Sequence, residues 1–204
     1  MEIYNLFPGS FGSNCYLLIS GNQAAVVDPS ADADVILQKT AEHGATLRYI
    51  LLTHGHFDHI CSLDTLREKT GVPAYIHAGD TDMPADAHKN AFYTFFAQTR
   101  TYNTPEKLVG EGDVLPLGEE QIRVLHTPGH TEGSVCYLCG DNILITGDTL
   151  FDRGFGRYDL YGGNPAKLRR SLSRLASLDH SLIIYAGHGC PTDLGDAVEN
   201  CALL

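Results

Sequence analysis

The stretch that decides the fold is Tyr49-Ile50-Leu51-Leu52-Thr53-His54-Gly55-His56-Phe57-Asp58-His59, in which an apolar run leads into three histidines and an aspartate. The run from Arg48 to Thr53 predicts a buried β-strand, because it is short and aliphatic. The block that follows places four potential metal ligands within six residues of the strand end. Imidazole and carboxylate groups suit zinc, manganese and iron alike. The stretch therefore indicates a metal site more firmly than it indicates which metal.

Further candidate ligands stand where other apolar strands are predicted to end. They are His130 after Thr127-Pro128-Gly129, Asp148 after Ile143–Gly147, and His188 after Ile183–Gly187. The glycine before each turn lets the backbone bend tightly and approach an ion closely. Strand ends are rigid platforms, so ligands placed there hold their geometry.

Apolar runs and turn residues divide the chain in a similar way in both halves, with strands preceding helices. The predicted strands are 14–19, 24–28, 48–53, 74–77, 114–117, 122–126, 134–138, 143–146 and 182–186, and the predicted helices are 31–43, 60–69, 165–178 and 193–203. This order favours an α/β sandwich in which two β-sheets pack together with helices outside. No low-complexity tract or linker interrupts it, so we expect a single domain over residues 1–204.

The segment from Asp80 to Gly112 has no clear period and is rich in aromatic residues. Such a long loop in a compact domain usually has a function, often as a lid or as a wall of the site. The alternative is a short helix that packs its aromatic side chains into the core. The sequence leaves both interpretations open.

Composition excludes some classes of partner. The chain has 14 basic and 25 acidic residues, and its net charge of −11 disfavours nucleic acid and anionic membranes as partners. No apolar run reaches 18 residues, so no membrane-spanning helix is expected. Met1–Asn5 shows no secretory pattern, so we expect a cytoplasmic protein with reduced cysteines. The oligomeric state is left open.

Cys136-Tyr137-Leu138-Cys139 has the spacing of a redox or metal motif but lies in a predicted strand. Residues three apart on a strand point to opposite faces. We therefore expect the two thiols to be packing residues.

The four ligand-bearing segments together resemble the metallo-β-lactamase superfamily. They are Thr53–His59, Thr127–Thr131, Thr146–Leu150 and Gly187–Gly189, and they follow the order of that family. The resemblance implies a four-layer αββα sandwich with two mixed β-sheets packed face to face and helices outside.

The resemblance also implies the role of each ligand. His54, His56 and His130 would bind one divalent ion. Asp58, His59 and His188 would bind a second, with Asp148 bridging the two. Zinc is the expected metal, with iron and manganese as alternatives. Two ions about 3.5–4 Å apart can generate a hydroxide nucleophile at neutral pH. Asp58 is the candidate catalytic residue, because its carboxylate would hydrogen-bond to that hydroxide or receive its proton.

Departures from other members narrow the expected activity. Asp148 stands where lactamases with a cysteine ligand carry that cysteine, and His56 stands where flavin-linked di-iron members carry glutamate. The segment Gly154–Gly163 resembles short bacterial glyoxalase II-like proteins, whose reaction hydrolyses S-D-lactoylglutathione to D-lactate and glutathione. We therefore expect a metal-dependent hydrolase acting on a small-molecule thioester.

The sequence says least about which residues contact the substrate. Larger glyoxalase II enzymes carry a C-terminal helical domain that contacts glutathione, whereas only about 16 residues follow His188 here. Contacts are therefore expected from the 80–112 segment or from Arg153 and Arg157. The alternative role for Arg157 is an ion pair with Asp159 or another carboxylate.

Two other functions stay open. A persulfide dioxygenase of the same fold would use one iron held by His54, His130 and Asp148, with open positions for oxygen and substrate. A non-catalytic metal-binding protein would have lost a ligand, whereas all seven candidates are present. The remaining histidines match no ligand motif and are expected to be structural or surface residues: His43, His77, His88, His126 and His180.

Overall fold

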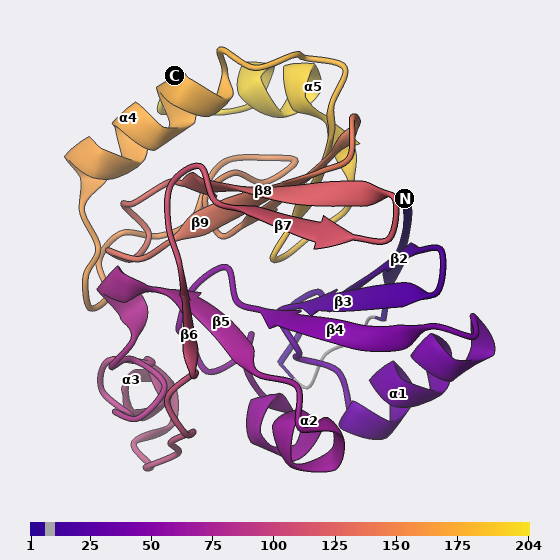
Figure 1. Ribbon diagram of the computed structural model, residues 1–204. Coiled ribbons are helices and arrows are strands. Elements are labelled where there is room, and N and C mark those ends of the chain that lie inside the picture. Colours follow the sequence, from indigo (N-terminus) through magenta and orange to yellow (C-terminus); the bar gives the residue numbers. More distant parts are fainter. Residues whose placement is uncertain (7–10) are drawn as a thin grey trace.

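The computed structural model describes residues 1–6 and 11–204. The chain forms two six-stranded mixed β-sheets that pack face to face, with helices on their outer faces (Figure 1). The four-layer αββα sandwich that the resemblance implied is therefore confirmed.

The first sheet comes from the N-terminal half and has the strand order β1-β2-β3-β4-β5-β6. Its strands are β1 (Glu2–Asn5), β2 (Tyr16–Ser20), β3 (Gln23–Val27), β4 (Thr46–Leu51), β5 (Ala74–His77) and β6 (Lys107–Val109). The strands from β3 to β6 pair in parallel, and β1 and β2 are antiparallel to their neighbours. Helices α1 (Ala33–Glu42) and α2 (Leu63–Thr70) make the crossovers and cover the outer face of this sheet (Figure 1).

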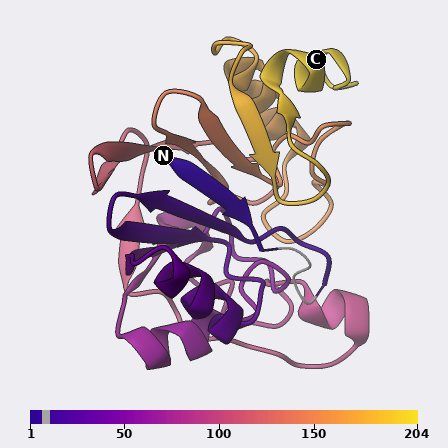
Figure 2. The same ribbon diagram turned by 90° about the vertical axis from the view of Figure 1, so that its right-hand side faces the viewer.

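The second sheet has the order β12-β11-β10-β9-β8-β7. Its strands are β7 (Val114–Leu117), β8 (Glu120–His126), β9 (Val135–Cys139), β10 (Ile143–Gly147), β11 (Ile183–Ala186) and β12 (Thr192–Asp193). Only β10 and β11 run in parallel, and α4 (Pro165–Leu175) is the helix between them. Helices α4 and α5 (Leu194–Glu199) lie on the outer face of this sheet (Figure 2).

The apolar runs of the sequence are continuous because both faces of the central strands are buried. In β2, Leu17 packs in the core beneath α1 and α2, whereas its neighbour Leu18 packs in the core between the sheets. A third core joins the second sheet to its helices and includes Leu168 and Leu172 of α4. Three apolar layers therefore hold four structural layers together.

The structure separates the two thiols of the Cys-x-x-Cys segment as expected. Cys136 packs in the core beneath α4, and Cys139 packs between the sheets. Both are buried reduced thiols. The packing role predicted for them is therefore confirmed.

Three short strands escaped sequence analysis, and each lies at or beside the edge of a sheet. They are β1, β6 and β12. An edge strand pairs on one side only and is partly solvated, so it needs no long apolar run. These segments therefore gave little hydrophobic signal.

The 80–112 segment contains both structures that the sequence left open. Helix α3 (Phe92–Phe96) lies in it, and Phe92 packs into the core beneath the first sheet. Phe95 and Phe96 of the same helix line a cleft described below. The segment therefore contributes both to the hydrophobic core and to the lining of the cleft. Within the described ranges, no helix is long and apolar enough to cross a membrane.

Candidate metal centre

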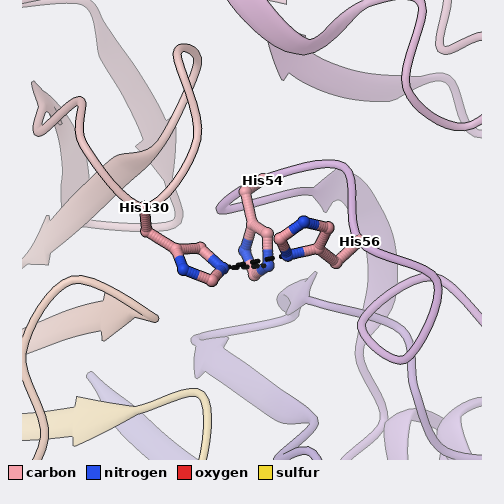
Figure 3. Close-up of side chains that lie close together, drawn as sticks. All are labelled: His54, His56 and His130. Atoms are coloured by element: carbon pink, nitrogen blue, oxygen red, sulfur yellow. Dashed lines mark hydrogen bonds between the residues drawn. The ribbon is translucent and has the colours of Figure 1, made fainter. Parts of the chain in front are cut away.

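Three imidazoles from two different loops converge on one point (Figure 3). His54 and His56 follow β4, and His130 follows β8. His130 Nε2 lies 2.9 Å from His56 Nδ1 and 3.3 Å from His54 Nε2. A tetrahedral zinc ion with Zn–N bonds of about 2.05 Å spaces its nitrogen ligands about 3.3 Å apart. The three buried nitrogens are therefore spaced like ligands of one ion.

A second cluster lies directly beside the first. Asp58 Oδ2 is 3.3 Å from His188 Nε2 and 3.6 Å from His59 Nε2. His59 is fully buried, whereas Asp58 and His188 are partly exposed. One carboxylate oxygen and two imidazole nitrogens thus meet at separations suited to a second ion.

Asp148 lies between the two clusters. Its Oδ2 is 3.5 Å from His130 Nε2 and 3.7 Å from His188 Nε2, and its Oδ1 is 3.4 Å from His59 Nε2. A single oxygen of Asp148 therefore faces both groups of histidines. The structure brings together all seven residues that the sequence singled out as ligands.

Buried polar atoms at the centre support the assignment of a cation site. His59 Nε2 and Asp148 Oδ1 are buried, face each other, and have no hydrogen-bond partner among the described residues. Nearly all buried polar atoms in proteins are paired, and an unpaired buried charge costs stability. A divalent ion would satisfy both atoms, so the residues present fit a metal pair. His56 Nε2 is also unpartnered, and no described group accounts for it.

Asp28 orients two of the ligands, and sequence analysis missed it. Its Oδ2 accepts hydrogen bonds from His59 Nδ1 at 2.9 Å and from Thr53 Oγ1 at 2.7 Å. His54 Nδ1 in turn donates to Thr53 Oγ1 at 3.0 Å. A hydrogen bond at Nδ1 leaves the Nε2 lone pair directed at the metal. Asp28 follows an apolar strand, as the ligands do, and this position is the signal that would have found it.

Asp28 is close enough to His54 and His59 to form a ligand group with them. Both of its oxygens are already occupied, because Oδ1 accepts from the Thr53 backbone N–H at 2.7 Å and Oδ2 holds His59 and the Thr53 hydroxyl. It therefore acts as an orienting carboxylate. Its φ of 52° is unusual for a residue other than glycine and shows that the chain is held in this position.

Backbone carbonyls orient two more of the ligand histidines, His130 and His188. His130 Nδ1 donates to the Arg157 carbonyl at 2.7 Å, and His188 Nδ1 donates to the Gly12 carbonyl at 3.3 Å. The segment that resembles short glyoxalase II-like proteins, which contains Arg157, therefore supports a ligand directly.

Asp80 joins the two loops that carry the three-histidine cluster. Its Oδ2 accepts from Thr131 Oγ1 at 2.6 Å and from Gly55 N at 3.2 Å, and its Oδ1 accepts from Gly133 N at 2.7 Å. Burial raises the pKa of Asp80 to about 6, against the opposing effect of these hydrogen bonds. Nothing in the sequence marked this residue, because it stands in a segment without a period.

Close packing explains the glycine before His188. A Cβ atom on Gly187 would lie 2.2 Å from Asp148 Oδ1 and 2.6 Å from His59 Cε1. Any side chain there would push two ligands apart, so the tight approach requires glycine. The Gly187 N–H also donates to the Gly147 carbonyl at 2.8 Å, which fixes the two ligand loops to each other.

The two clusters differ in charge. Burial and the neighbouring imidazoles hold the pKa values of His54 and His56 well below the usual value, so both are neutral. Burial would also lower the pKa of His59, but Asp58, Asp148 and Asp28 outweigh it and raise that pKa to about 10. Burial opposes ionisation of Asp58, yet His59 and His188 hold its pKa well below the usual value. Without metal, His59 therefore carries the positive charge that balances the carboxylates.

A cleft of about 330 Å³ opens onto the centre. Five of the ligands line it: His56, Asp58, His130, Asp148 and His188. Arg157 lines it as well, and its guanidinium makes the ion pair with Asp159 that the sequence left open, at 2.7 Å and 2.8 Å. Substrate binding by Arg157 stays a prediction.

The arrangement defines a class of protein: an αββα sandwich with two adjacent histidine and carboxylate clusters at its strand ends. The family model of the metallo-beta-lactamase superfamily matches residues 8–188. The chain belongs to the metallo-β-lactamase superfamily, and its relatives include metal-dependent hydrolases.

Two relatives span nearly the same length. The chain is 39% identical to a probable metallo-hydrolase, YqgX, of Bacillus subtilis, over 91% of this chain and 89% of that protein. It is 32% identical to the hydroxyacylglutathione hydrolase GloC of Haemophilus influenzae, over 91% of this chain and 90% of that protein.

Two solved structures are similar throughout. The crystal structure of BLEG-1 B3 metallo-beta-lactamase superposes with a TM-score of 0.89 at 30% identity, covering 97% of each chain. The crystal structure of TTHA1623 in a di-iron-bound form gives 0.85 at 32% identity, covering 98% of this chain and all of that one. A related protein of the same fold therefore holds two metal ions.

Proton release on metal binding should differ between the clusters. At pH 7.5 an ion entering the His54, His56 and His130 cluster should release almost no protons, because these imidazoles are already neutral. An ion entering the cluster with His59 should release at least one, because a ligand must be deprotonated. Calorimetric titration of the metal-free protein with zinc, in buffers of different ionisation enthalpy, measures this number for each event.

The control for this titration is His180→Ala, which removes an exposed imidazole that belongs to neither ligand cluster and should leave both events unchanged. Equal proton release at the two events would contradict the charge asymmetry.

Proposed function

We propose that this protein is a glyoxalase II-type hydrolase that cleaves acyl thioesters, with two divalent ions, zinc being the expected metal, at the seven-ligand centre. The observation that carries the proposal is the complete ligand set facing an open cleft. The similarity to a hydroxyacylglutathione hydrolase of nearly the same length supports the thioester as the scissile group.

Metal ions bound at this centre would supply a hydroxide nucleophile at neutral pH and polarise the substrate carbonyl. The residues of the chain hold and orient that chemistry. His54, His56 and His130 form a neutral pocket, and Asp148 faces both clusters. Asp28 holds the His59 ring directly at Nδ1 and the His54 ring through Thr53 Oγ1. The Arg157 carbonyl holds the His130 ring at Nδ1.

Asp58 is placed to accept a hydrogen bond from water at the reacting centre. It is the carboxylate in the second cluster that is partly exposed and lines the cleft, and the nearby imidazoles keep it ionised. The ionised carboxylate can therefore orient the attacking water.

The lining of the cleft suits a leaving group that needs no acid. Among the lining residues of the described chain, the titratable groups are metal ligands and Arg157. A thiolate leaves readily without protonation, so thioester cleavage requires no further general acid. This match between leaving group and available residues favours thioesters over substrates with poorer leaving groups.

A mono-iron persulfide dioxygenase is the second candidate. The observation behind it is a subset of the same ligands: His54 Nε2 and Asp148 Oδ2 lie 3.3 Å and 3.5 Å from His130 Nε2. Two histidines and one carboxylate form the ligand set of many oxygen-activating iron sites. The third candidate, a non-catalytic metal-binding protein, is disfavoured because no ligand is missing.

The paired assay that tests the function measures thiol release and oxygen uptake on the same preparation. The zinc- or iron-loaded protein should release thiol from S-D-lactoylglutathione or simpler acyl thioesters, and it should consume no oxygen with glutathione persulfide. Nitrocefin serves as the lactam control. Oxygen uptake without thioester cleavage would establish the dioxygenase, and faster opening of nitrocefin than of any thioester would overturn the proposal.

Removal of the Asp58 carboxylate should lower turnover far more than removal of histidines that are not candidate ligands. Asp58→Ala should lower kcat by about 10²–10⁴-fold, the range for loss of a positioned proton-transfer group. His43→Ala and His180→Ala should change kcat less than about twofold, because His43 caps α1 and His180 is exposed. Steady-state kinetics with metal content measured in parallel tests this, and equal losses in all three variants would show that the site is misplaced.

A further inference from the structure

Most of the apolar side chains that line the cleft are phenylalanines. Phe11, Phe57, Phe95 and Phe96 line it, and we name these four residues the aromatic wall. Phe57 stands between the ligands His56 and Asp58 in the chain, and all three residues line the cleft. The other apolar lining residues are Ala91 and Leu160.

The rings of the aromatic wall pack against one another edge to face or tilted, which fixes their positions. The centroid of Phe57 lies 5.0 Å from that of Phe11, 5.9 Å from that of Phe95 and 5.7 Å from that of Phe96. Arg100 supports the cluster, because its Cζ atom lies 6.0 Å from the ring centroid of Phe11 and 5.9 Å from that of Phe92. Phe92 is buried and packs against Phe57. The wall is therefore a preformed surface.

Much of this apolar surface is left open to solvent. Phe11 is 37% exposed, Phe95 is 52% exposed and Phe96 is 43% exposed. Folding alone does not favour three exposed phenyl rings beside one cleft, and clustered exposed apolar surface usually marks a binding site. A ligand group that covers these rings would remove them from water.

The cleft offers little to a polyanionic ligand. Apart from the ligand histidines, Arg157 is the only basic side chain among its described lining residues, and Asp159 already holds two of its nitrogens. The guanidinium also lies over the Phe95 ring at 5.6 Å. Glutathione carries two carboxylates, and placing them against phenyl rings without a free cation would cost solvation energy.

We propose that the aromatic wall selects the acyl part of the substrate, so that thioesters with an uncharged aromatic or branched aliphatic acyl group are cleaved in preference to S-D-lactoylglutathione. The inference rests on the proposed thioesterase function. In the reaction, a C–O bond forms between the water oxygen and the acyl carbon, the C–S bond breaks, and its electron pair leaves with sulfur. The products are a carboxylate and a thiolate, and the protons that water loses pass to the thiolate or to solvent. The acyl group is attached to the reacting carbon, beside the ligands His56 and Asp58 that flank Phe57 in the chain.

The experiment compares two substrates across matched variants of α3. The phenylacetyl thioester of N-acetylcysteamine is the neutral aromatic substrate, and S-D-lactoylglutathione is the charged one. Phe95→Ala removes a ring of the aromatic wall. Tyr93→Ala removes another exposed ring from the same helix. The Tyr93 ring packs on His88 and does not line the cleft.

The wild-type protein should show a higher kcat/KM for the phenylacetyl thioester by about tenfold or more, the scale of a good aromatic contact. Phe95→Ala should remove about tenfold of this advantage through a raised KM for the phenylacetyl thioester. Tyr93→Ala should alter neither substrate. Preference for lactoylglutathione in the wild type, or equal effects of the two variants, would overturn the inference while leaving the thioesterase function intact.

A binding measurement provides a readout that does not depend on turnover. S-Phenethyl-N-acetylcysteamine, a thioether that cannot be hydrolysed, should bind the metal-free wild type and Tyr93→Ala alike in calorimetry, and Phe95→Ala about tenfold more weakly. Circular dichroism establishes that each variant is folded. Equal binding to all three proteins would show that the aromatic wall takes no ligand. Failure of the metal-loaded protein to cleave any thioester would instead remove the proposed function, and the inference with it.

Discussion

The structure depends on the close approach of like charges that only cations can compensate. Asp58 and Asp148 both lie within 3.7 Å of His188 Nε2, and Asp28 lies on the far side of His59. In water these carboxylates would remain apart, but here the strand ends hold them together. This one constraint accounts for the raised pKa of His59, for the unpartnered Asp148 oxygen and for the glycine at position 187. Two metal ions would compensate the carboxylates and bind the unpartnered Asp148 oxygen.

The sandwich supplies the force that holds the ligands in place. Ligands come from loops after β4, β8, β10 and β11, which belong to different sheets. The packed apolar layers bring these loops to one side of the molecule, and burial of the strands on both faces makes them rigid. A backbone hydrogen bond from Val135 N to the Thr53 carbonyl, at 2.9 Å, joins the two sheets next to His54. The energy of the core is thus used to position side chains that repel one another.

The sequence singled out the seven residues that the structure brings together because each stands directly after an apolar strand with a turn residue, as at Gly187-His188. Features that lack such a local signature were missed. Edge strand β6 is too short and polar to stand out, and Asp80 acts only through loops that are distant in sequence. Asp28 shares the local signature, but its role depends on which edge of the His59 ring it meets, which only the fold determines. The aromatic wall likewise depends on which face of α3 turns toward the cleft.

The central claim is that seven side chains from distant parts of the chain surround two metal ions. Anomalous diffraction from crystals of the zinc-loaded protein, collected at the zinc absorption edge, tests it most directly. The account predicts two peaks about 3.5–4 Å apart, one within bonding distance of His54, His56 and His130 and the other beside Asp58, His59 and His188. A single peak at full occupancy in excess zinc, or peaks remote from these residues, would contradict it.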